Sequence, residues 1–449
     1  MGKLFGTDGI RGEANRHPMD AAIAFRVGQA VAKFFKKEEH RTKVVIGKDT
    51  RISGYMLESS LEAGISSMGG VSYLVRVLPT PGIGFISQSM RADAGIVISA
   101  SHNPYQDNGI KIFSGDGFKL SDKQEDIIEE LMLGGKLPGM VPPPNEMGRS
   151  YRMEDAPGRY IVFLKNSFPR DLSMEGMKIV LDTANGATYR VAPAAFAELG
   201  ADLEVIHNNP NGLNINDNCG SQYTQDLEKR VLETGAALGL AFDGDGDRLI
   251  AVDEKGRTIT GDQILIICAR MLKEQGKLKN DLLVSTVMSN LGLSIACRKY
   301  GFKHHASRVG DRYVLEDMQR LGAVIGGEES GHLIFLNHHT TGDGIIAALQ
   351  LIAAMIRGNK TLSELANMMD IFPQKLINVE VKSKPDISTV PKVVEAIKQV
   401  EAELGDQGRV LVRYSGTQNA CRVMVEGPSD DVTEKYCGQI ADVVRDALG

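Results

Sequence analysis

The sequence has few cysteines and no pattern that would pair them. Its five cysteines form no CxxC pair, and the histidine pairs at 304–305 and 338–339 lack the helical spacing of metal ligands. An odd number of unclustered thiols predicts reduced cysteines and argues against a disulfide framework or a zinc site. No apolar run approaches the roughly 18 residues that span a bilayer, and residues 1–5 show no signal-peptide core. We therefore expect a cytoplasmic protein.

The sequence also lacks an excess of positive charge and two common catalytic signatures. Its formal net charge is −6, which argues against nucleic acid as the main partner because a phosphate backbone attracts a basic surface. Any anion site must therefore be local. No GxxxxGK segment is present, which argues against a P-loop enzyme, and no GxSxG surrounds Ser101, which argues against an α/β-hydrolase.

A strand–helix–strand pattern occurs three times along the chain, over residues 43–77, 178–206 and 282–306. In each copy an apolar strand ends in a polar loop, and an amphipathic helix ends at glycine before a second strand. Short connections of this kind are typical of right-handed parallel βαβ units, and glycine closes a helix well. The pattern predicts three similar mixed α/β domains.

The pattern changes after residue 369. Strands are expected at 378–381, 409–413 and 422–425, with helices at 390–404 and 431–448. This order is typical of a small α+β domain. With the proline-rich stretch 134–148 as a linker region, the expected domains are 1–152, 153–257, 258–369 and 370–449.

The first loop with chemical potential contains Ser101. It follows an apolar strand at 95–98, and Asn103-Pro104 imposes a turn that lifts the serine out at the strand's end. Ligands bind at this end of the strands in α/β sheets. The alternative is a turn that only caps the strand, because a serine hydroxyl needs a base or an electrophile to become a nucleophile.

The second loop places Asp243, Asp245 and Asp247 at alternate positions, separated by two glycines. Three converging carboxylates repel one another unless a cation lies between them, and oxygen ligands favour Mg²⁺ where phosphate supplies another ligand. The alternatives are an acidic surface turn and an EF-hand. The EF-hand is disfavoured because Arg248 occupies the position that needs glycine, and because both flanks read as strands.

Two further loops carry polar groups beside glycine. The segment 326–332 presents Glu328 and Ser330, with His332 nearby, and its acceptors suit sugar hydroxyls. The segment 413–422 lies between two strands, and arginine forks, hydroxyls and backbone N–H groups can cradle a phosphate there. Its relevant residues are Arg413, Ser415, Gly416, Thr417 and Arg422. Taken alone, the first loop could be a polar turn and the second a hairpin turn.

These four loops, in this order, resemble the α-D-phosphohexomutase family over essentially the whole chain. The resemblance implies three α/β domains and a small C-terminal domain around a central cleft. Similar enzymes often form homodimers, so a homodimer is also possible for this chain. It also implies that Ser101 is a phosphoserine and that Mg²⁺ is bound by Asp243, Asp245, Asp247 and an oxygen of Ser101 or its phosphate. Arg248, Lys111 and His332 are the further implied catalytic residues. Arg11, Arg308, Glu328, Ser330, Arg413, Ser415, Gly416, Thr417 and Arg422 are the implied substrate-binding residues.

The implied reaction moves a phosphoryl group between two hydroxyls of a hexose phosphate through a sugar 1,6-bisphosphate. The opening residues 5–12 and the chain length are most similar to family members that act on a glucosamine phosphate, so the resemblance implies this substrate and a product that feeds UDP-N-acetylglucosamine and cell-wall precursors. The alternatives are the same chemistry on a mannose or glucose phosphate, a catalytically silent phosphosugar-binding protein, and a magnesium-dependent phosphatase. One departure from the family is Gln418-Asn419, where Glu-Pro is common. A hinge is expected near residues 367–375, because a mobile small domain must release and regrip the intermediate.

Overall fold

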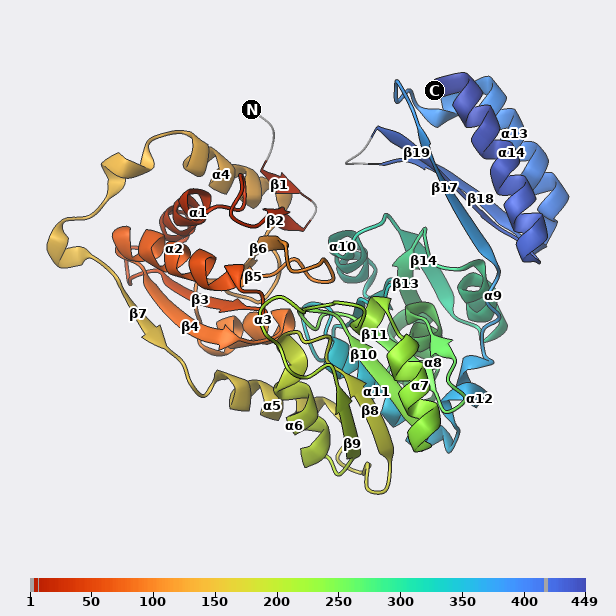
Figure 1. The fold of residues 1–449 in the computed structure, drawn as a ribbon, viewed down its shortest axis with the longest axis horizontal. Helices are drawn as coiled ribbons and strands as arrows, with labels where there is room; N and C mark the ends of the chain where they lie inside the picture. Colours follow the sequence, from red (N-terminus) through yellow and green to blue (C-terminus); the bar gives the residue numbers. More distant parts are fainter. Residues whose placement is uncertain (1–3, 7, 416–418) are drawn as a thin grey trace. The chain divides into compact units, whose positions relative to one another are not determined.

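The structure is a computed structural model that describes residues 4–6, 8–415 and 419–449. The chain divides into two compact units, one made of Met1–Met288 and Phe302–Met368, the other of Ser289–Gly301 and Met369–Gly449. Within the described residues the strands form three sheets in the first unit and one in the second (Figure 1). None of the described helices has both the length and the apolar character needed to cross a membrane.

The first sheet has seven strands. They are β1 (Phe5–Gly6), β2 (Gly9–Glu13), β3 (Lys43–Lys48), β4 (Val71–Val77), β5 (Ala94–Ile98), β6 (Asp107–Ser114) and β7 (Arg149–Arg152). Their order is β1-β2-β6-β5-β3-β4-β7. Strand β3 pairs in parallel with β4 and β5, whereas β6 pairs antiparallel with β5 and β2. Strand β5 is apolar and buried throughout, as is typical of a central strand covered on both faces.

Two helices of this first part, at residues 21–34 and 53–67, approach each other so closely that their backbones are in contact. The helices of this part are α1 (Ala21–Phe34), α2 (Ser53–Ser67), α3 (Thr80–Ser89) and α4 (Asp122–Leu133). A Cβ on Gly28 of α1 would lie 2.4 Å from the carbonyl oxygen of Leu61, and a Cβ on Gly64 of α2 would lie 2.1 Å from that of Phe25. Each helix therefore needs glycine where it approaches the other.

The second sheet carries the acidic loop. Its strands are β8 (Lys178–Asp182), β9 (Asp202–Ile206), β10 (Leu238–Phe242), β11 (Leu249–Asp253) and β12 (Thr258–Ile259), and its helices are α5 (Ala156–Ser167), α6 (Val191–Glu198) and α7 (Gln225–Thr234). The strand order is β12-β11-β10-β8-β9. Strand β8 pairs in parallel with β9 and β10, and β10 pairs antiparallel with β11. The tight β10–β11 connection consists of residues 243–248.

The third sheet has four strands in the order β14-β13-β15-β16. They are β13 (Leu282–Thr286), β14 (Lys303–Ser307), β15 (Ile325–Gly327) and β16 (Leu333–Phe335), and the first-unit helices of this part are α8 (Gly261–Glu274), α10 (Asp311–Leu321), α11 (Gly344–Gly358) and α12 (Leu362–Ala366). Helix α11 is buried over most of its length. Its start is fixed by Asp343, whose Oδ1 accepts hydrogen bonds from the backbone N–H groups of Ile345 and Ile346.

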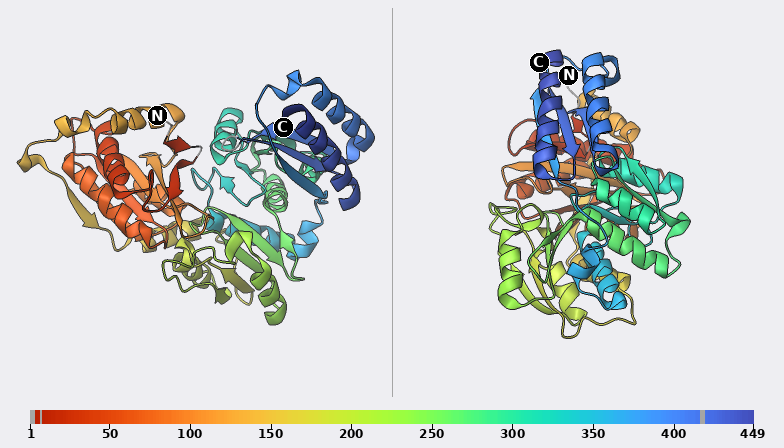
Figure 2. Two further views of the ribbon diagram at one scale, coloured as in Figure 1. Left: turned by 45° about the horizontal axis from the view of Figure 1, so that its top comes forward. Right: turned by 90° about the vertical axis from the view of Figure 1, so that its right-hand side faces the viewer.

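The second unit is an antiparallel sheet covered by two long helices. Its elements are α9 (Leu291–Lys299), β17 (Gln374–Glu380), α13 (Pro391–Leu404), β18 (Arg409–Tyr414), β19 (Ala420–Glu426) and α14 (Asp430–Leu448). The strand order is β17-β19-β18, and α13 and α14 lie side by side on one face of the sheet (Figures 1 and 2). Glu426 is fully buried and accepts hydrogen bonds from Arg409 Nε at 2.6 Å and from the Leu291 N–H at 3.0 Å, which joins the start of α9 to the sheet.

The structure confirms the predicted fold class. All three predicted strand pairs are parallel, namely β3 with β4, β8 with β9, and β13 with β14, and the C-terminal part is a small α+β domain. The sequence did not predict β7, an edge strand that follows the proline-rich stretch and pairs with β4.

Candidate active site

Ser101 lies just beyond the end of β5 in an unusual backbone conformation. Its φ is +53° and its side chain is buried. The Ser99 hydroxyl accepts a hydrogen bond from the Ser101 N–H at 2.9 Å. The Ser101 carbonyl accepts hydrogen bonds from the Arg51 guanidinium at 3.2 Å and the Asn216 amide at 2.9 Å. Because a left-handed serine persists only where its surroundings hold it, these contacts fix the position of the hydroxyl.

The acidic loop touches the serine loop directly. A Cβ on Gly244 would lie 2.6 Å from the Ser101 carbonyl oxygen, so only glycine permits this approach. The Ser101 hydroxyl donates a hydrogen bond to Asp243 Oδ2 across 2.5 Å. The structure therefore brings together the serine loop and the acidic loop that the sequence analysis singled out.

The three aspartates form a compact buried group. One carboxylate oxygen from each of Asp243, Asp245 and Asp247 lies within 4.8 Å of the others. Asp245 Oδ1 and Asp247 Oδ1 are buried and have no hydrogen-bond partner in the part of the chain that the structure describes. Burial, with the charges of Asp247 and Asp245, raises the pKa of Asp243 well above its usual value. Buried oxygen ligands with orphaned acceptors fit a hard divalent cation such as Mg²⁺.

Lys111 on β6 reaches into this acidic group. Its Nζ donates a hydrogen bond to Asp245 Oδ2 at 3.0 Å and lies 3.2 Å from Asp8 and 3.7 Å from Asp247. Burial alone would lower the pKa of Lys111, but Asp245, Asp8 and Asp247 outweigh burial and raise the pKa above its usual value. The ammonium therefore stays charged beside the aspartates. Thr80 adds a hydrogen bond to Asp245 Oδ2 at 2.6 Å.

His332 and Arg248 lie on the other side of Asp247. His332 Nδ1 is 3.6 Å from Asp247 Oδ2, and its Nε2 is 3.6 Å from Asp311 Oδ2. Burial would lower the pKa of His332, but Asp247 and Asp311 outweigh it and raise the pKa. Arg248 Nε lies 3.9 Å from Asp247 Oδ1 and is buried without a hydrogen-bond partner among the described side chains and backbone. Both side chains therefore border the acidic group.

The remaining first-unit residues predicted to bind substrate are Arg11 on β2 and three loop residues, Arg308, Glu328 and Ser330. The Glu328 Oε1 accepts a hydrogen bond from the Gly310 N–H at 3.1 Å, whereas Ser330 is exposed. Arg308 is exposed with its guanidinium 3.9 Å from the centre of the Tyr313 ring. Arg11 forms a short ion pair with Asp8.

A cavity of about 410 Å³ adjoins His332. Polar and charged side chains line it, including Ser114, Lys119, Gln124, Asp311 and Arg312. Lys119 forms short contacts with Asp8 and Asp311, and Arg312 donates a hydrogen bond to Glu125 at 2.9 Å. The lining also includes apolar side chains such as Leu120 and Ile334 and the carboxylate of Glu316, so charges of both signs and apolar groups border the cavity.

The predicted phosphate loop belongs to the second unit. Arg413 on β18 faces Arg422 on β19 in the antiparallel register, and burial and this neighbour lower the pKa of Arg413. The Nε atoms of both arginines are buried and lack hydrogen-bond partners among the described residues. The Ser415 N–H donates to the Ala420 carbonyl at 2.8 Å. Gly416 and Thr417 lie outside the described residues, as does Gln418 of the Gln418-Asn419 departure.

Sequence reasoning missed residues that support the site. Arg51 is fully buried, pairs with Asp49, and donates a hydrogen bond to the Asn103 carbonyl at 2.5 Å. Asn216 Nδ2 donates to the same carbonyl at 3.0 Å. The available signal for Asp49 and Arg51 was their place directly after the central strand β3. Nothing in the local sequence marks Asn216.

Family comparisons cover all four parts of the chain. Models described as phosphoglucomutase/phosphomannomutase alpha/beta/alpha domains I, II and III match residues 2–137, 158–256 and 260–372, and the model of the C-terminal domain matches residues 376–443. A curated relative, the phosphoglucosamine mutase of Syntrophobacter fumaroxidans, is 76% identical over 449 residues, which is 100% of each chain.

Solved structures share the fold at low identity. A phosphoglucomutase/phosphomannomutase family protein from Burkholderia thailandensis matches with a TM-score of 0.80 at 22% identity, covering 99% of this chain and 97% of the other. The N-acetylphosphoglucosamine mutase of Aspergillus fumigatus, solved in complex with GlcNAc-6P and magnesium, matches with a TM-score of 0.66 at 16% identity, covering 99% and 96%. With the full-length identity to the bacterial relative, the chain belongs to the phosphoglucosamine mutases of the phosphoglucomutase/phosphomannomutase family.

Proposed function

We propose that the chain interconverts glucosamine 6-phosphate and glucosamine 1-phosphate, with Ser101 as the phosphoryl carrier and a sugar 1,6-bisphosphate as intermediate and activator. One observation carries this proposal: the Ser101 hydroxyl lies 2.5 Å from a carboxylate of the acidic group. A phosphoryl group on that oxygen would lie beside a bound cation. The membership in the phosphoglucosamine mutases supports the choice of sugar.

We propose that one Mg²⁺ per chain is held by Asp243, Asp245 and Asp247, with an oxygen of Ser101 or its phosphate as a further ligand. The orphaned oxygens of Asp245 and Asp247 support this assignment. When bound, Mg²⁺ neutralises negative charge that develops on the oxygens of the transferring phosphoryl group.

The surrounding residues then stabilise charge and handle protons. When the phosphoryl group passes to the sugar hydroxyl, the Ser101 Oγ–P bond breaks, and the Ser101 oxygen takes up a proton from solvent, which it donates in a hydrogen bond to Asp243 Oδ2, as in the structure. Lys111 and Arg248 supply fixed positive charge at the phosphoryl oxygens. We assign transfer of the sugar hydroxyl proton to His332, because three carboxylates within 3.7 Å hold the Lys111 ammonium in its charged form.

Substrate binding is assigned to the remaining loops. Glu328 and Ser330 accept and donate hydrogen bonds to ring hydroxyls, and Arg11 and Arg308 contribute charge near the substrate. The loop of the second unit holds the phosphate that does not react, through Arg413, Ser415, Gly416, Thr417 and Arg422. We propose that the hinge needed to release and regrip the intermediate lies at 367–375, a stretch that includes the unit boundary at Met368–Met369.

We also propose domain boundaries at 1–152, 153–257, 258–369 and 370–449, a location in the cytoplasm and a product that feeds UDP-N-acetylglucosamine synthesis. All five cysteines, which lie among the described residues, are buried and outside any disulfide, which supports a reducing compartment. A homodimer stays a prediction, which sedimentation at several protein concentrations will test.

Two measurements test the proposed function: turnover of sugar phosphates and the intact mass of the protein. Turnover on the 6-phosphates of glucosamine, glucose and mannose should be fastest for glucosamine, and faster turnover on another sugar would reassign the substrate. Intact-mass measurement should show a fraction of the chain carrying one phosphate, which sugar bisphosphate turns over. Release of inorganic phosphate without mutase turnover would instead indicate a phosphatase.

A further inference from the structure

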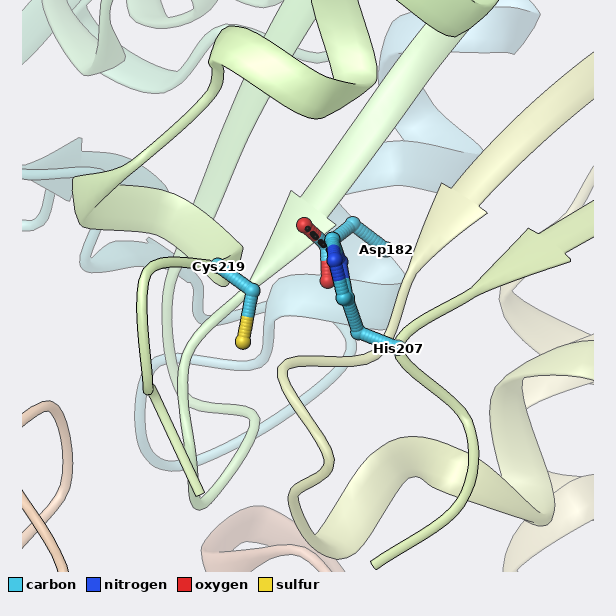
Figure 3. A group of neighbouring side chains, drawn as sticks. All are labelled: Asp182, His207 and Cys219. Atoms are coloured by element: carbon cyan, nitrogen blue, oxygen red, sulfur yellow. Dashed lines mark ion pairs between the residues drawn. The ribbon is translucent and has the colours of Figure 1, made fainter. Parts of the chain in front are cut away.

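A second group of metal-ligating side chains lies in the second sheet's part of the chain, apart from the acidic loop. It consists of Asp182, His207 and Cys219, whose nearest donor atoms lie within 4.8 Å of one another. Figure 3 shows the three side chains converging from the end of β8, the end of β9 and the loop that precedes α7. The group combines a carboxylate, an imidazole and a thiol, which distinguishes it from the all-oxygen set of Asp243, Asp245 and Asp247.

The backbone fixes two of these side chains beside each other. Asp182 is fully buried, and its two oxygens accept hydrogen bonds from the N–H groups of Ala184 and Gly220, each at 2.8 Å. Gly220 directly follows Cys219 and has a φ of +74°, and a Cβ on it would lie 2.6 Å from Ala184 Cβ and from the Phe242 carbonyl oxygen. The bond to Gly220 therefore holds the Cys219 turn against the carboxylate.

One ring nitrogen of His207 faces Asp182, and the other faces the exposed carboxylate of Asp226. Its Nδ1 lies 3.0 Å from Asp182 Oδ2 but is buried and forms no hydrogen bond of normal geometry with any described residue. Its Nε2 lies 3.3 Å from Asp226 Oδ2. A carboxylate on one nitrogen of a ligating histidine fixes its tautomer, so a hydrogen bond from Nε2–H to Asp226 would leave Nδ1 able to bind an ion, which would replace the present contact of Nδ1 with Asp182.

The backbone of His207 is also held in place. Its φ is +47°, a conformation uncommon for residues other than glycine. Its carbonyl accepts hydrogen bonds from the Thr183 hydroxyl and the Asn185 N–H, both at 2.7 Å. Strain of this kind persists where surrounding contacts enforce it and often marks a functional position.

We propose that Asp182, His207 and Cys219 form a second cation site, for a thiophilic divalent ion of the zinc class, with solvent at the fourth position. Bonds of about 2.0–2.3 Å in a tetrahedron place ligand atoms about 3.3–3.8 Å apart, so small side-chain shifts close the site. Three protein ligands with an open position are typical of such ions. Binding displaces the thiol proton to solvent, and the partly exposed His207 leaves a path for the ion.

This second site is connected to the serine loop. Cys219 and His207 lie at opposite ends of the loop 207–219, and Asn216 of that loop donates hydrogen bonds to the carbonyls of Ser101 and Asn103. The Asn216 N–H in turn bonds the Ala184 carbonyl at 3.0 Å. An ion at Asp182, His207 and Cys219 would therefore clamp the loop that positions Ser101.

The test is a titration of metal-free full-length protein with Co²⁺ in the presence of excess Mg²⁺, followed by absorption. We expect a thiolate-to-cobalt charge-transfer band that saturates at one equivalent and that Zn²⁺ removes. Cys219→Ser should abolish the band. Two control variants should retain it: Cys437→Ser, which changes a buried thiol of the second unit, and Asp243→Asn, which changes the acidic group. No band in the wild type, or an equal band in Cys219→Ser, would overturn the site.

Two variants guard against effects on folding. His207→Asn tolerates the positive φ and should weaken Co²⁺ binding at least tenfold, and the exposed Asp226→Asn should weaken it about tenfold or more. Unchanged affinity in both folded variants would overturn the ligand assignment. Hydrogen exchange of residues 208–218 should slow when Zn²⁺ is added; unchanged exchange with an intact cobalt band would overturn the clamp.

Discussion

Ser101 and Asp243 lie 142 residues apart in sequence, yet the serine hydroxyl donates a hydrogen bond to the Asp243 carboxylate across 2.5 Å. Ser101→Ala removes the only oxygen that the proposed mechanism can phosphorylate. We expect mutase turnover to fall to background, with an unchanged melting temperature, and the phosphate-bearing mass to disappear. A variant that retained turnover would show that another group carries the phosphoryl.

Asp245→Asn tests the acidic group. The substitution keeps the shape of the side chain but removes a charge, so we expect the Mg²⁺ concentration for half-maximal activity to rise and kcat to fall by about 10²–10³. Activity should be measured across a Mg²⁺ titration after chelation. Asp217→Asn, on a nearby loop outside the acidic group, is the matched control and should leave the Mg²⁺ titration unchanged. An Mg²⁺ response of Asp245→Asn identical to wild type would remove Asp245 from the ion site.

Arg413→Ala tests the phosphate loop. Loss of charge-assisted hydrogen bonds to phosphate costs about 1.5–3 kcal/mol, so KM for glucosamine 6-phosphate should rise about 10–100-fold. Arg445→Ala, an exposed arginine of α14 paired with Asp442, is the control and should leave KM unchanged. If both variants behaved alike, the loop would not hold the substrate's phosphate.

Asn216→Asp tests positioning of the serine. Aspartate tolerates the positive φ of this position but cannot donate to the Ser101 and Asn103 carbonyls. We expect kcat to fall about 10–100-fold with KM nearly constant, because misplacement affects the reacting oxygen and not the substrate contacts. Asn218→Asp, which shares the positive φ but not these contacts, should keep wild-type kcat.

Because His339 is buried, we expect the free energy of unfolding to depend on pH. Burial lowers its pKa to about 4, against a weaker opposing effect of its contact with the Pro81 carbonyl. Between pH 6.5 and 4 the unfolded chain therefore binds the extra proton, so the free energy of unfolding falls as the pH falls through this window, by up to about 3 kcal/mol.

Urea unfolding at several pH values measures this dependence. His339→Gln should flatten the loss of stability between pH 6.5 and 4, whereas substitution of the exposed His17 by Gln should not. An identical pH dependence in His339→Gln and wild type would assign acid destabilisation to other groups.

The sequence predicted those parts of the fold and site that are encoded locally. The parallel strand pairs follow from apolar runs interrupted by polar loops, and the loops of Ser101 and Asp243 follow strands directly. Arg51 and Asn216 were missed because their contacts with the serine loop arise only when distant segments pack. The sequence analysis also argued against a zinc site because no CxxC pair is present. It missed the group of Asp182, His207 and Cys219 because these residues come together from three separate segments.

The paired glycines of α1 and α2 have a consequence for variation in this protein. Neither Gly28 nor Gly64 has a role in the proposed chemistry, yet even a methyl group at either would meet a carbonyl oxygen of the opposite helix. Tolerance to substitution should therefore vanish at both, although neither glycine belongs to the proposed site. The requirement comes from the interhelical spacing itself, and a compensating change would have to move an entire helix.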